Sequence, residues 1–221
     1  MHKKSILIKN ARIVNEGKIV EGDVLIEDQY IKEIANSISV KNADVTVIDA
    51  ENNYLIPGVI DDQVHFREPG LTHKATIETE SRAAIAGGIT SFIEMPNTNP
   101  QATTIEKLED KFQIAANTSS ANYSFMFGGT NDNLDDILKV APLKVAGLKL
   151  FLGSSTGNML VDNPEVLEKI FKSTDLLISV HCEDDNTIKQ NHALYLERYG
   201  EDIPIQCHPE LRSAESCYLS S

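Results

Sequence analysis

Apolar and polar positions follow two different rhythms along this chain, and the rhythm changes near residue 57. Between residues 5 and 56, short apolar runs alternate with polar positions and are separated by Asn, Gly and Asp. This pattern is typical of short antiparallel strands joined by turns. The dipeptide Pro57-Gly58 then marks a boundary. We therefore expect one β-rich region over residues 1–56 and a second domain over residues 57–221.

After residue 57, apolar runs alternate with amphipathic stretches of helical period. We expect strands at 59–66, 90–95, 122–127, 145–152 and 176–181, and helices at 76–86, 104–116, 133–140, 164–171 and 186–199, with a last amphipathic stretch at 210–219. Five strand-then-helix units predict an α/β domain with a parallel sheet. A complete (β/α)8 barrel needs eight such units. The five units therefore form either an open doubly wound sheet or the first part of a longer barrel.

Composition narrows the class of protein. The chain has 221 residues, 41% of them hydrophobic and 24% charged, and a net charge of −13. Such an acidic chain is a poor partner for nucleic acid or for an anionic membrane. No apolar run approaches the roughly 20 residues that span a bilayer, and the first apolar run is too short for a signal peptide. Three scattered cysteines fit reduced thiols, so we expect a cytoplasmic protein.

One lysine stands out because it lies inside an apolar strand. Lys149 is flanked by Leu148 and Leu150 in the sequence Val-Ala-Gly-Leu-Lys-Leu-Phe-Leu. A bare buried ammonium costs several kcal/mol, so this lysine needs a partner, a lowered pKa or a chemical modification. Conversion to a carbamate would make it a carboxylate, which can bridge metal ions held by imidazoles. His65 and His181, at the ends of two other predicted strands, are the candidate imidazoles.

The first strand of the second domain carries more candidate chemistry. Asp61, Gln63, His65 and Arg67 alternate, which predicts that they project to one face near the carboxyl end of the strand, where barrel active sites assemble. A serine-containing run, Gly153-Ser-Ser-Thr-Gly157, matches a nucleophile pattern, but a nucleophile elbow must run straight into a helix. No helical pattern follows directly, so we do not expect serine hydrolysis.

Taken together, these motifs resemble those of the dihydroorotases in the amidohydrolase superfamily. The matching segments occur in family order and are Asp61-Asp-Gln-Val-His-Phe-Arg-Glu-Pro-Gly70, Met95-Pro-Asn-Thr-Asn-Pro100, Gly147-Leu-Lys-Leu-Phe151 and Val180-His-Cys-Glu183. The resemblance covers the whole chain. It implies a small β-sandwich region followed by an incomplete TIM-like (β/α)8 barrel of about five units.

The resemblance also implies roles for five residues. His65, His181 and a carbamylated Lys149 would hold zinc, one or two ions per complete subunit, and Arg67 and Asn97 would bind the carboxylate of the substrate. Chemistry agrees, because imidazole and carboxylate oxygen suit zinc and a guanidinium fork suits a carboxylate. Allantoinases and hydantoinases usually lack an arginine at this place, so Arg67 favours a dihydroorotase.

Two departures from the family pattern bear on activity. Gln63 stands where the family has its first metal histidine, and an amide is a poor zinc ligand. The family's fourth histidine, its proton-shuttle aspartate and the strands that complete the β-region are expected beyond residue 221. We therefore expect these 221 residues to be inactive by themselves.

The resemblance implies a zinc-dependent hydrolase that interconverts N-carbamoyl-aspartate and dihydroorotate in pyrimidine biosynthesis, acting on a small-molecule substrate as a homo-oligomer when full length. Two alternatives stay open. One is a metal-poor, non-catalytic homologue that binds a partner enzyme, which Gln63 favours. The other is a hydantoinase- or allantoinase-type hydrolase with a different ring.

Overall fold

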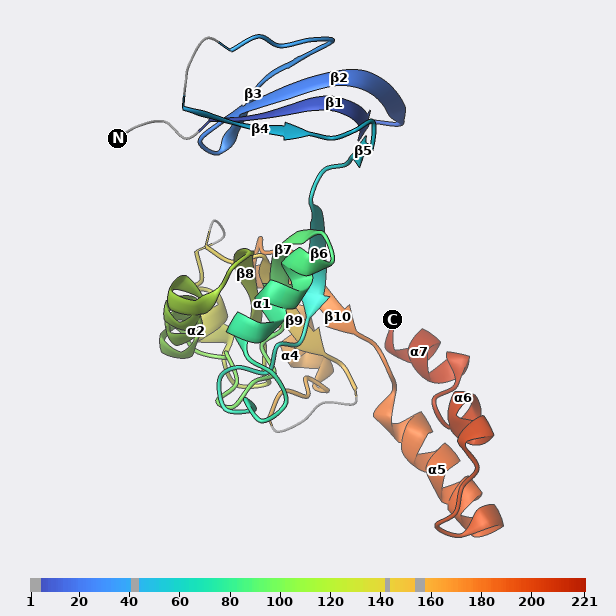
Figure 1. The fold of residues 1–221 in the computed structure, drawn as a ribbon. Helices are drawn as coiled ribbons and strands as arrows, with labels where there is room; N and C mark the ends of the chain where they lie inside the picture. The colour runs from blue at the N-terminus through green and yellow to red at the C-terminus, as the bar shows by residue number, and fades with distance from the viewer. Residues whose placement is uncertain (1–4, 41–43, 142–143, 154–157) are drawn as a thin grey trace. The chain divides into compact units, whose positions relative to one another are not determined.

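The computed structural model describes residues 5–40, 44–141, 144–153 and 158–221. The chain divides into two compact units, Met1–Gly58 and Val59–Ser221 (Figure 1). Each unit has its own sheet.

The first unit is built on one mixed sheet. Its strands are β1 (Ser5–Asn15), β2 (Lys18–Glu27), β3 (Tyr30–Ala35), β4 (Val45–Asp49) and β5 (Tyr54–Leu55). They lie in the order β3-β2-β1-β4, and β5 also pairs with β1. The expectation of antiparallel pairing holds for β1–β2 and β2–β3 but is wrong for β4 and β5, which run parallel to β1. The chain crosses from one sheet edge to the other between β3 and β4, and such a crossover produces parallel neighbours.

A buried aspartate organises one face of this sheet. Leu7, Leu25 and Ile38 form its small core. Beside them, the Asp23 carboxylate accepts hydrogen bonds from the backbone N–H groups of Asn10 at 3.0 Å and Ile38 at 2.9 Å. Asn10 has a φ of 55° and lies at an irregularity of the β1–β2 register, so the aspartate ties a β-bulge to the segment after β3. The unit also has an apolar groove of about 370 Å³, lined among others by Ile8, Val24, Ile26, Ile31 and Ile34.

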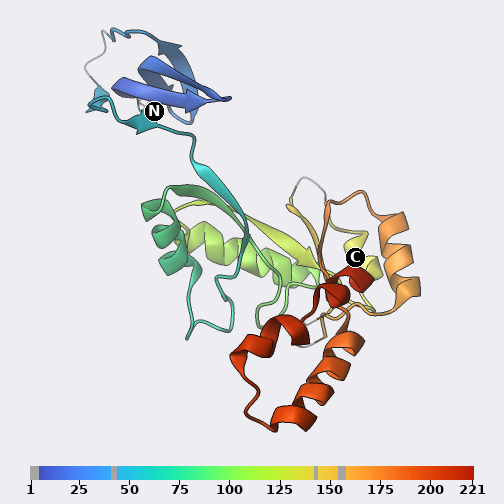
Figure 2. The ribbon, with the colours of Figure 1, turned by 90° about the vertical axis from the view of Figure 1, so that its right-hand side faces the viewer.

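The second unit contains five parallel strands in the order β10-β9-β8-β7-β6. They are β6 (Val59–Val64), β7 (Ile89–Glu94), β8 (Asn122–Gly128), β9 (Gly147–Phe151) and β10 (Ile178–His181). The helices are α1 (Ile77–Ala86), α2 (Ile105–Thr118), α3 (Leu134–Ile137), α4 (Pro164–Ser173), α5 (Asp185–Tyr199), α6 (His208–Leu211) and α7 (Ala214–Ser220), with a 3₁₀ turn, η1 (Ile205–Cys207), before α6. The prediction of five strand-then-helix units is confirmed, and the sheet is curled (Figure 2).

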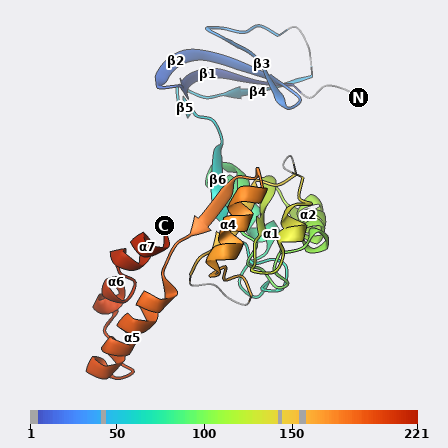
Figure 3. The ribbon, with the colours of Figure 1, turned by 180° about the vertical axis from the view of Figure 1, so that it is seen from behind.

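Side-chain caps explain where these helices begin. Thr76 and Thr104 precede α1 and α2, and each side chain accepts a hydrogen bond from a backbone N–H of the first turn. Asn163 caps α4, whose first residue is Pro164, a residue suited to that position. After β10 the chain continues into α5, which packs with α6 and α7 as a separate helical arm (Figure 3).

Apolar residues on both faces of the curled sheet make the core of this unit. Phe92, Phe125, Phe127, Leu148 and Leu150 are almost completely buried. Phe66, just after β6, packs on Phe92 with 4.5 Å between ring centroids. Strands buried on both faces are typical of parallel sheets covered by helices. In the part of the chain that the structure describes, every helix is too short or too polar to cross a membrane.

Candidate active site

The candidate residues gather at the carboxyl ends of four parallel strands. His65 follows β6, Asn97 follows β7, Lys149 lies in β9 and His181 ends β10. Parallel strands present all their carboxyl ends at one edge of the sheet, which is where ligands bind in α/β folds. The site is therefore assembled from segments up to 116 positions apart in the chain (65 to 181).

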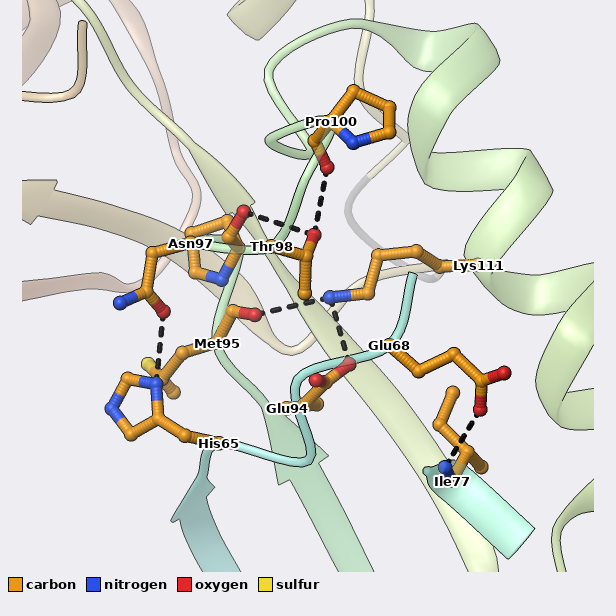
Figure 4. A network of polar contacts seen from close by, with 10 residues as sticks. His65, Glu68, Ile77, Glu94, Met95, Asn97, Thr98, Pro100 and Lys111 are labelled. Atoms are coloured by element: carbon orange, nitrogen blue, oxygen red, sulfur yellow. Dashed lines mark hydrogen bonds and ion pairs between the residues drawn. The ribbon is translucent and has the colours of Figure 1, made fainter. Parts of the chain in front are cut away.

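His65 is oriented by an amide side chain. Its Nδ1 lies 2.9 Å from Oδ1 of Asn97 (Figure 4). Because an amide oxygen only accepts hydrogen bonds, Nδ1 carries the proton and Nε2 keeps a lone pair. Burial lowers the pKa of His65 below its usual value, and the positive charges of Arg67, Lys149 and Lys111 act in the same direction against the bond to Asn97. The ring is thus held neutral, the form that binds a cation.

Lys149 is buried in the way its apolar neighbours predict. The residue is only 2% exposed, and in the described parts of the chain no carboxylate pairs with its amine. Its Nζ lies 5.3 Å from the centre of the Phe151 ring. Burial lowers the pKa of Lys149, which raises the fraction of neutral amine at physiological pH. A neutral amine is the nucleophile that carbamate formation requires.

His181 is oriented by a carboxylate. Its Nε2 lies 2.8 Å from Oε2 of Glu183, and Arg212 forms an ion pair with the same carboxylate oxygen. The carboxylate acceptor places the proton on Nε2, so Nδ1 keeps the lone pair. A histidine backed by a carboxylate is the usual arrangement of metal-binding imidazoles.

His65, Lys149 and His181, the three metal-ligand candidates, are linked through shared neighbours. Lys149 and His181 both contact Phe151, whose ring centroid lies 6.3 Å from that of His181. The charge of Lys149 acts on His65. In the described ranges, no group of three His, Cys, Asp or Glu side chains could hold a metal ion. Two imidazole nitrogens and the oxygens of a carbamate, if Lys149 were converted to one, would be a donor set that suits zinc chemically.

A cavity of about 650 Å³ lies beside His65. It is lined by Arg67, Leu71, Lys74, Asn97, Thr98, Asn99, Pro100, Gln101 and Lys107. This lining has three cationic side chains and, among the described residues, no carboxylate. Asn97 belongs both to the cavity and to the hydrogen bond with His65. The cavity is therefore suited to an anionic ligand held next to the imidazole.

The two loops that carry the cavity are in direct backbone contact. Asn99 N donates to Pro69 O at 3.1 Å. Gly70 has a φ of +82°, and a Cβ at that position would lie 1.8 Å from Asn99 O. Only glycine allows this approach, so the loop after β6 and the loop after β7 form one wall.

The expected alternation along the first strand ends early. Asp61 and Gln63 lie in β6, but the strand stops at Val64. Arg67 has a φ of +69°, which turns the backbone and breaks the period-two pattern that predicted one common face. Gln63 is exposed, and its N–H donates to the Asp61 carboxylate at 3.2 Å. The residues between Gly153 and Asn158, which carry the serines of the nucleophile-like run, lie outside the described residues.

Two side-chain pairs near the site are not among the residues predicted from the sequence. The first is Glu183 with His181: Glu183 orients the imidazole, while the neighbouring Asp184 is the N-cap of α5. The second pair is Glu94 and Lys111, both completely buried, with Nζ 2.7 Å from Oε2. A signal for it exists, since Lys111 falls on the buried stripe of α2 between Leu108 and Ala115.

Comparison with known proteins identifies relatives of this chain. A family described as Dihydro-orotase-like matches residues 52–214. Dihydroorotases of Staphylococcus epidermidis and Methanosarcina mazei are 31% identical over 219 residues and 35% identical over 225 residues. Each alignment covers 97% of this chain. It covers 50% of the length of the Staphylococcus relative and 48% of the length of the Methanosarcina relative. The chain thus spans about half the length of these relatives.

A solved structure gives the same result for the fold. The L-hydantoinase (dihydropyrimidinase) of Arthrobacter aurescens matches with a TM-score of 0.90 and 27% identity, over 97% of this chain and 48% of that chain. This match confirms the expected incomplete (β/α) barrel and decides against the alternative of an open doubly wound sheet. With the family match extending over residues 52–214, this chain belongs to the dihydroorotase-like family.

Proposed function

We propose that the protein is a zinc-dependent hydrolase of cyclic amides that interconverts N-carbamoyl-aspartate and dihydroorotate, a step of pyrimidine biosynthesis. The observation that carries this proposal is the cavity lined by Arg67, Lys74, Lys107 and Asn97, with cations and no described carboxylate. A ring that bears a carboxylate gains charge-assisted hydrogen bonds there, whereas a neutral ring does not. Relatives named dihydroorotase support the same substrate class.

In this proposal His65, His181 and carbamylated Lys149 hold zinc. The free lone pairs of the two imidazoles and the lowered pKa of Lys149 support that assignment. When bound, zinc supplies Lewis acidity, which polarises an amide carbonyl and makes water a stronger nucleophile near neutral pH.

In the same proposal, Arg67 and Asn97 position the substrate. The Arg67 guanidinium forms a bidentate contact with the substrate carboxylate, and the Asn97 amide N–H donates to it while its oxygen holds His65. Because Asn97 contacts both groups, the ring is placed at a fixed distance from the imidazole. Such positioning lowers the entropic cost of reaching the transition state.

The alternative of a metal-poor, non-catalytic homologue has one observation in its favour. Gln63 occupies the position of an expected histidine and is exposed. Lys149 argues against it, since it is buried and no carboxylate of the described residues pairs with it; a protein without a metal would gain stability from an apolar residue there. Gln63 is consistent with fewer metal ions than two.

The test combines metal analysis with a substrate panel on the full-length protein. We expect about one zinc per chain, a mass increase of one carbamate lost on acidification, and turnover of dihydroorotate well above that of hydantoin and dihydrouracil. Zinc with preference for the neutral rings would support the hydantoinase alternative. Absence of both zinc and turnover would overturn the proposal in favour of the non-catalytic homologue.

A further inference from the structure

A buried ion pair lies directly behind the two loops of the cavity. Glu94 is the last residue of β7, and Lys111 reaches it from α2. Both side chains are at most 1% exposed, and Nζ lies 2.7 Å from Oε2. Burial raises the pKa of Glu94 and lowers that of Lys111, and each shift is opposed by the charge of the partner. A buried pair of this kind is a costly way to gain stability, so it invites another explanation.

The pair is connected to the loop that carries Arg67. The backbone N–H groups of Phe66 and Arg67 act on the Glu94 carboxylate and lower its pKa, against the larger effect of burial. Neither carboxylate oxygen accepts a hydrogen bond of ordinary geometry from a described residue. Two successive N–H groups turned toward one anion form a backbone nest. Arg67 has a φ of +69°, a conformation that is unfavourable for a residue with a side chain.

The same pair is connected to the loop that carries Asn97. Lys111 Nζ donates to the backbone carbonyl of Met95 at 3.0 Å, two residues before Asn97 (Figure 4). Met95 N in turn donates to Val64 O at 2.9 Å, beside His65. Glu94 and Lys111 thus contact the backbone on both sides of the cavity without lining it.

We propose that the buried Glu94–Lys111 pair is a positioning device that fixes the turned backbone at Arg67, and with it the arginine that selects a carboxylate-bearing ligand. This inference rests on the proposed function for the ligand. For the backbone it rests on the buried ion pair, the bond from Lys111 to Met95 and the turned conformation of Arg67. In physical terms, the carboxylate of Glu94 acts as an internal anion that holds the two amides in place. The arginine side chain then starts from one backbone conformation and loses less entropy on binding.

Two double variants of the full-length protein separate positioning from simple stability. Glu94→Leu/Lys111→Met and Glu94→Gln/Lys111→Met both remove the two charges, so neither leaves a single buried charge. They differ because glutamine keeps a carbonyl oxygen able to accept a hydrogen bond from the amides, whereas leucine has no polar group. An exposed ion pair between Glu109 of α2 and Lys144, at 3.6 Å, provides the control Glu109→Gln/Lys144→Met.

Hydrogen exchange measures the backbone part without any ligand. We expect the Phe66 and Arg67 amides to exchange at least about tenfold faster in the leucine variant than in the glutamine variant, with the control unchanged. Equal exchange at these two amides in both double variants would overturn the inference, whatever the protein binds.

Calorimetric titration measures the ligand part, with N-carbamoyl-aspartate as the anionic probe and hydantoin as the neutral one. We expect the leucine variant to bind the anionic probe about tenfold more weakly than the glutamine variant, at similar Tm and with unchanged affinity for hydantoin. Equal affinities of the two variants for the anionic probe overturn the positioning role. If the unaltered protein binds only hydantoin, the proposed substrate fails, while the exchange result still decides the backbone role.

Discussion

At the residue scale, the candidate site depends on which ring nitrogen of each histidine is occupied. Asn97 holds Nδ1 of His65, and Glu183 holds Nε2 of His181. Each contact fixes a tautomer and leaves one lone pair for a cation. The sequence indicated which residues to consider, but the tautomers follow only from the three-dimensional partners.

Arg67→Met tests the residue that is expected to recognise the carboxylate. Losing a charge-assisted, bidentate contact costs about 2 kcal/mol, so KM for dihydroorotate should rise roughly 30-fold. The rate with hydantoin should hardly change, since that ring has no carboxylate. The matched control is Lys74→Met, an exposed cation of the same cavity, which should raise KM no more than about threefold. Equal effects of the two substitutions would contradict a special role for Arg67.

Lys149→Met tests the buried amine. Methionine has a similar length and no charge, and it removes the desolvation cost that lowers the pKa of Lys149. We expect zinc content to fall below about one tenth of its original value, while the Tm of the metal-free protein stays the same or rises. A lower Tm of the metal-free variant would show that the amine stabilises the fold. Retained zinc would remove Lys149 from the donor set.

At the element scale, periodicity predicted most of the second unit because its strands and helices each bury a regular face. The strand expected at 59–66 ends at Val64, because the backbone turns at Arg67, whose φ of +69° is not a strand conformation. The parallel pairing of β4 depends on a crossover that no local pattern encodes. Lys111 shows the limit of the pattern, because a lysine on an apolar helical stripe needs a partner that the helix itself does not supply.

Asp23 provides an element-scale prediction for the first unit. Its bonds to the N–H groups of Ile38 and Asn10 lower the pKa of Asp23 below 3.8. A lowered carboxyl pKa means stabilisation that is complete above the ordinary value and is lost as the pH falls through the folded-state value. Asp23→Ala should therefore destabilise the unit by about 1–3 kcal/mol at pH 7, and by progressively less as the pH falls through the lowered pKa of Asp23. Urea unfolding at several pH values measures this, with exposed Glu33→Gln as the control. A pH-independent loss would contradict the carboxylate's role.

Arg212→Met tests how the helical arm supports the site. Arg212, between α6 and α7, forms an ion pair with the carboxylate that orients His181. Losing such outer support typically costs 10–100-fold in metal affinity, so we expect roughly tenfold weaker zinc binding. Competition with a chelator measures it, and Arg198→Met on α5 is the control. Equal zinc affinity in the Arg212 variant and the unaltered protein would mean that Glu183 orients His181 unaided.

At the scale of the whole molecule, the described sheet has two unpaired edges, β6 and β10. Apolar side chains are exposed on both, among them Ile60 at 66% and Val180 at 40%, and Leu177 just before β10 at 69%. Open parallel edges with apolar side chains favour pairing with other chains. We therefore expect the 221 residues expressed alone to self-associate, which sedimentation velocity at several concentrations would reveal as a rising mean mass.

Ile60→Lys/Leu177→Lys should lower that mass, whereas Lys substitutions at exposed Leu194 and Leu196 of α5, away from the edges, should not. A concentration-independent monomer would contradict the argument, because edges that remain unpaired at high concentration must be covered within the chain itself.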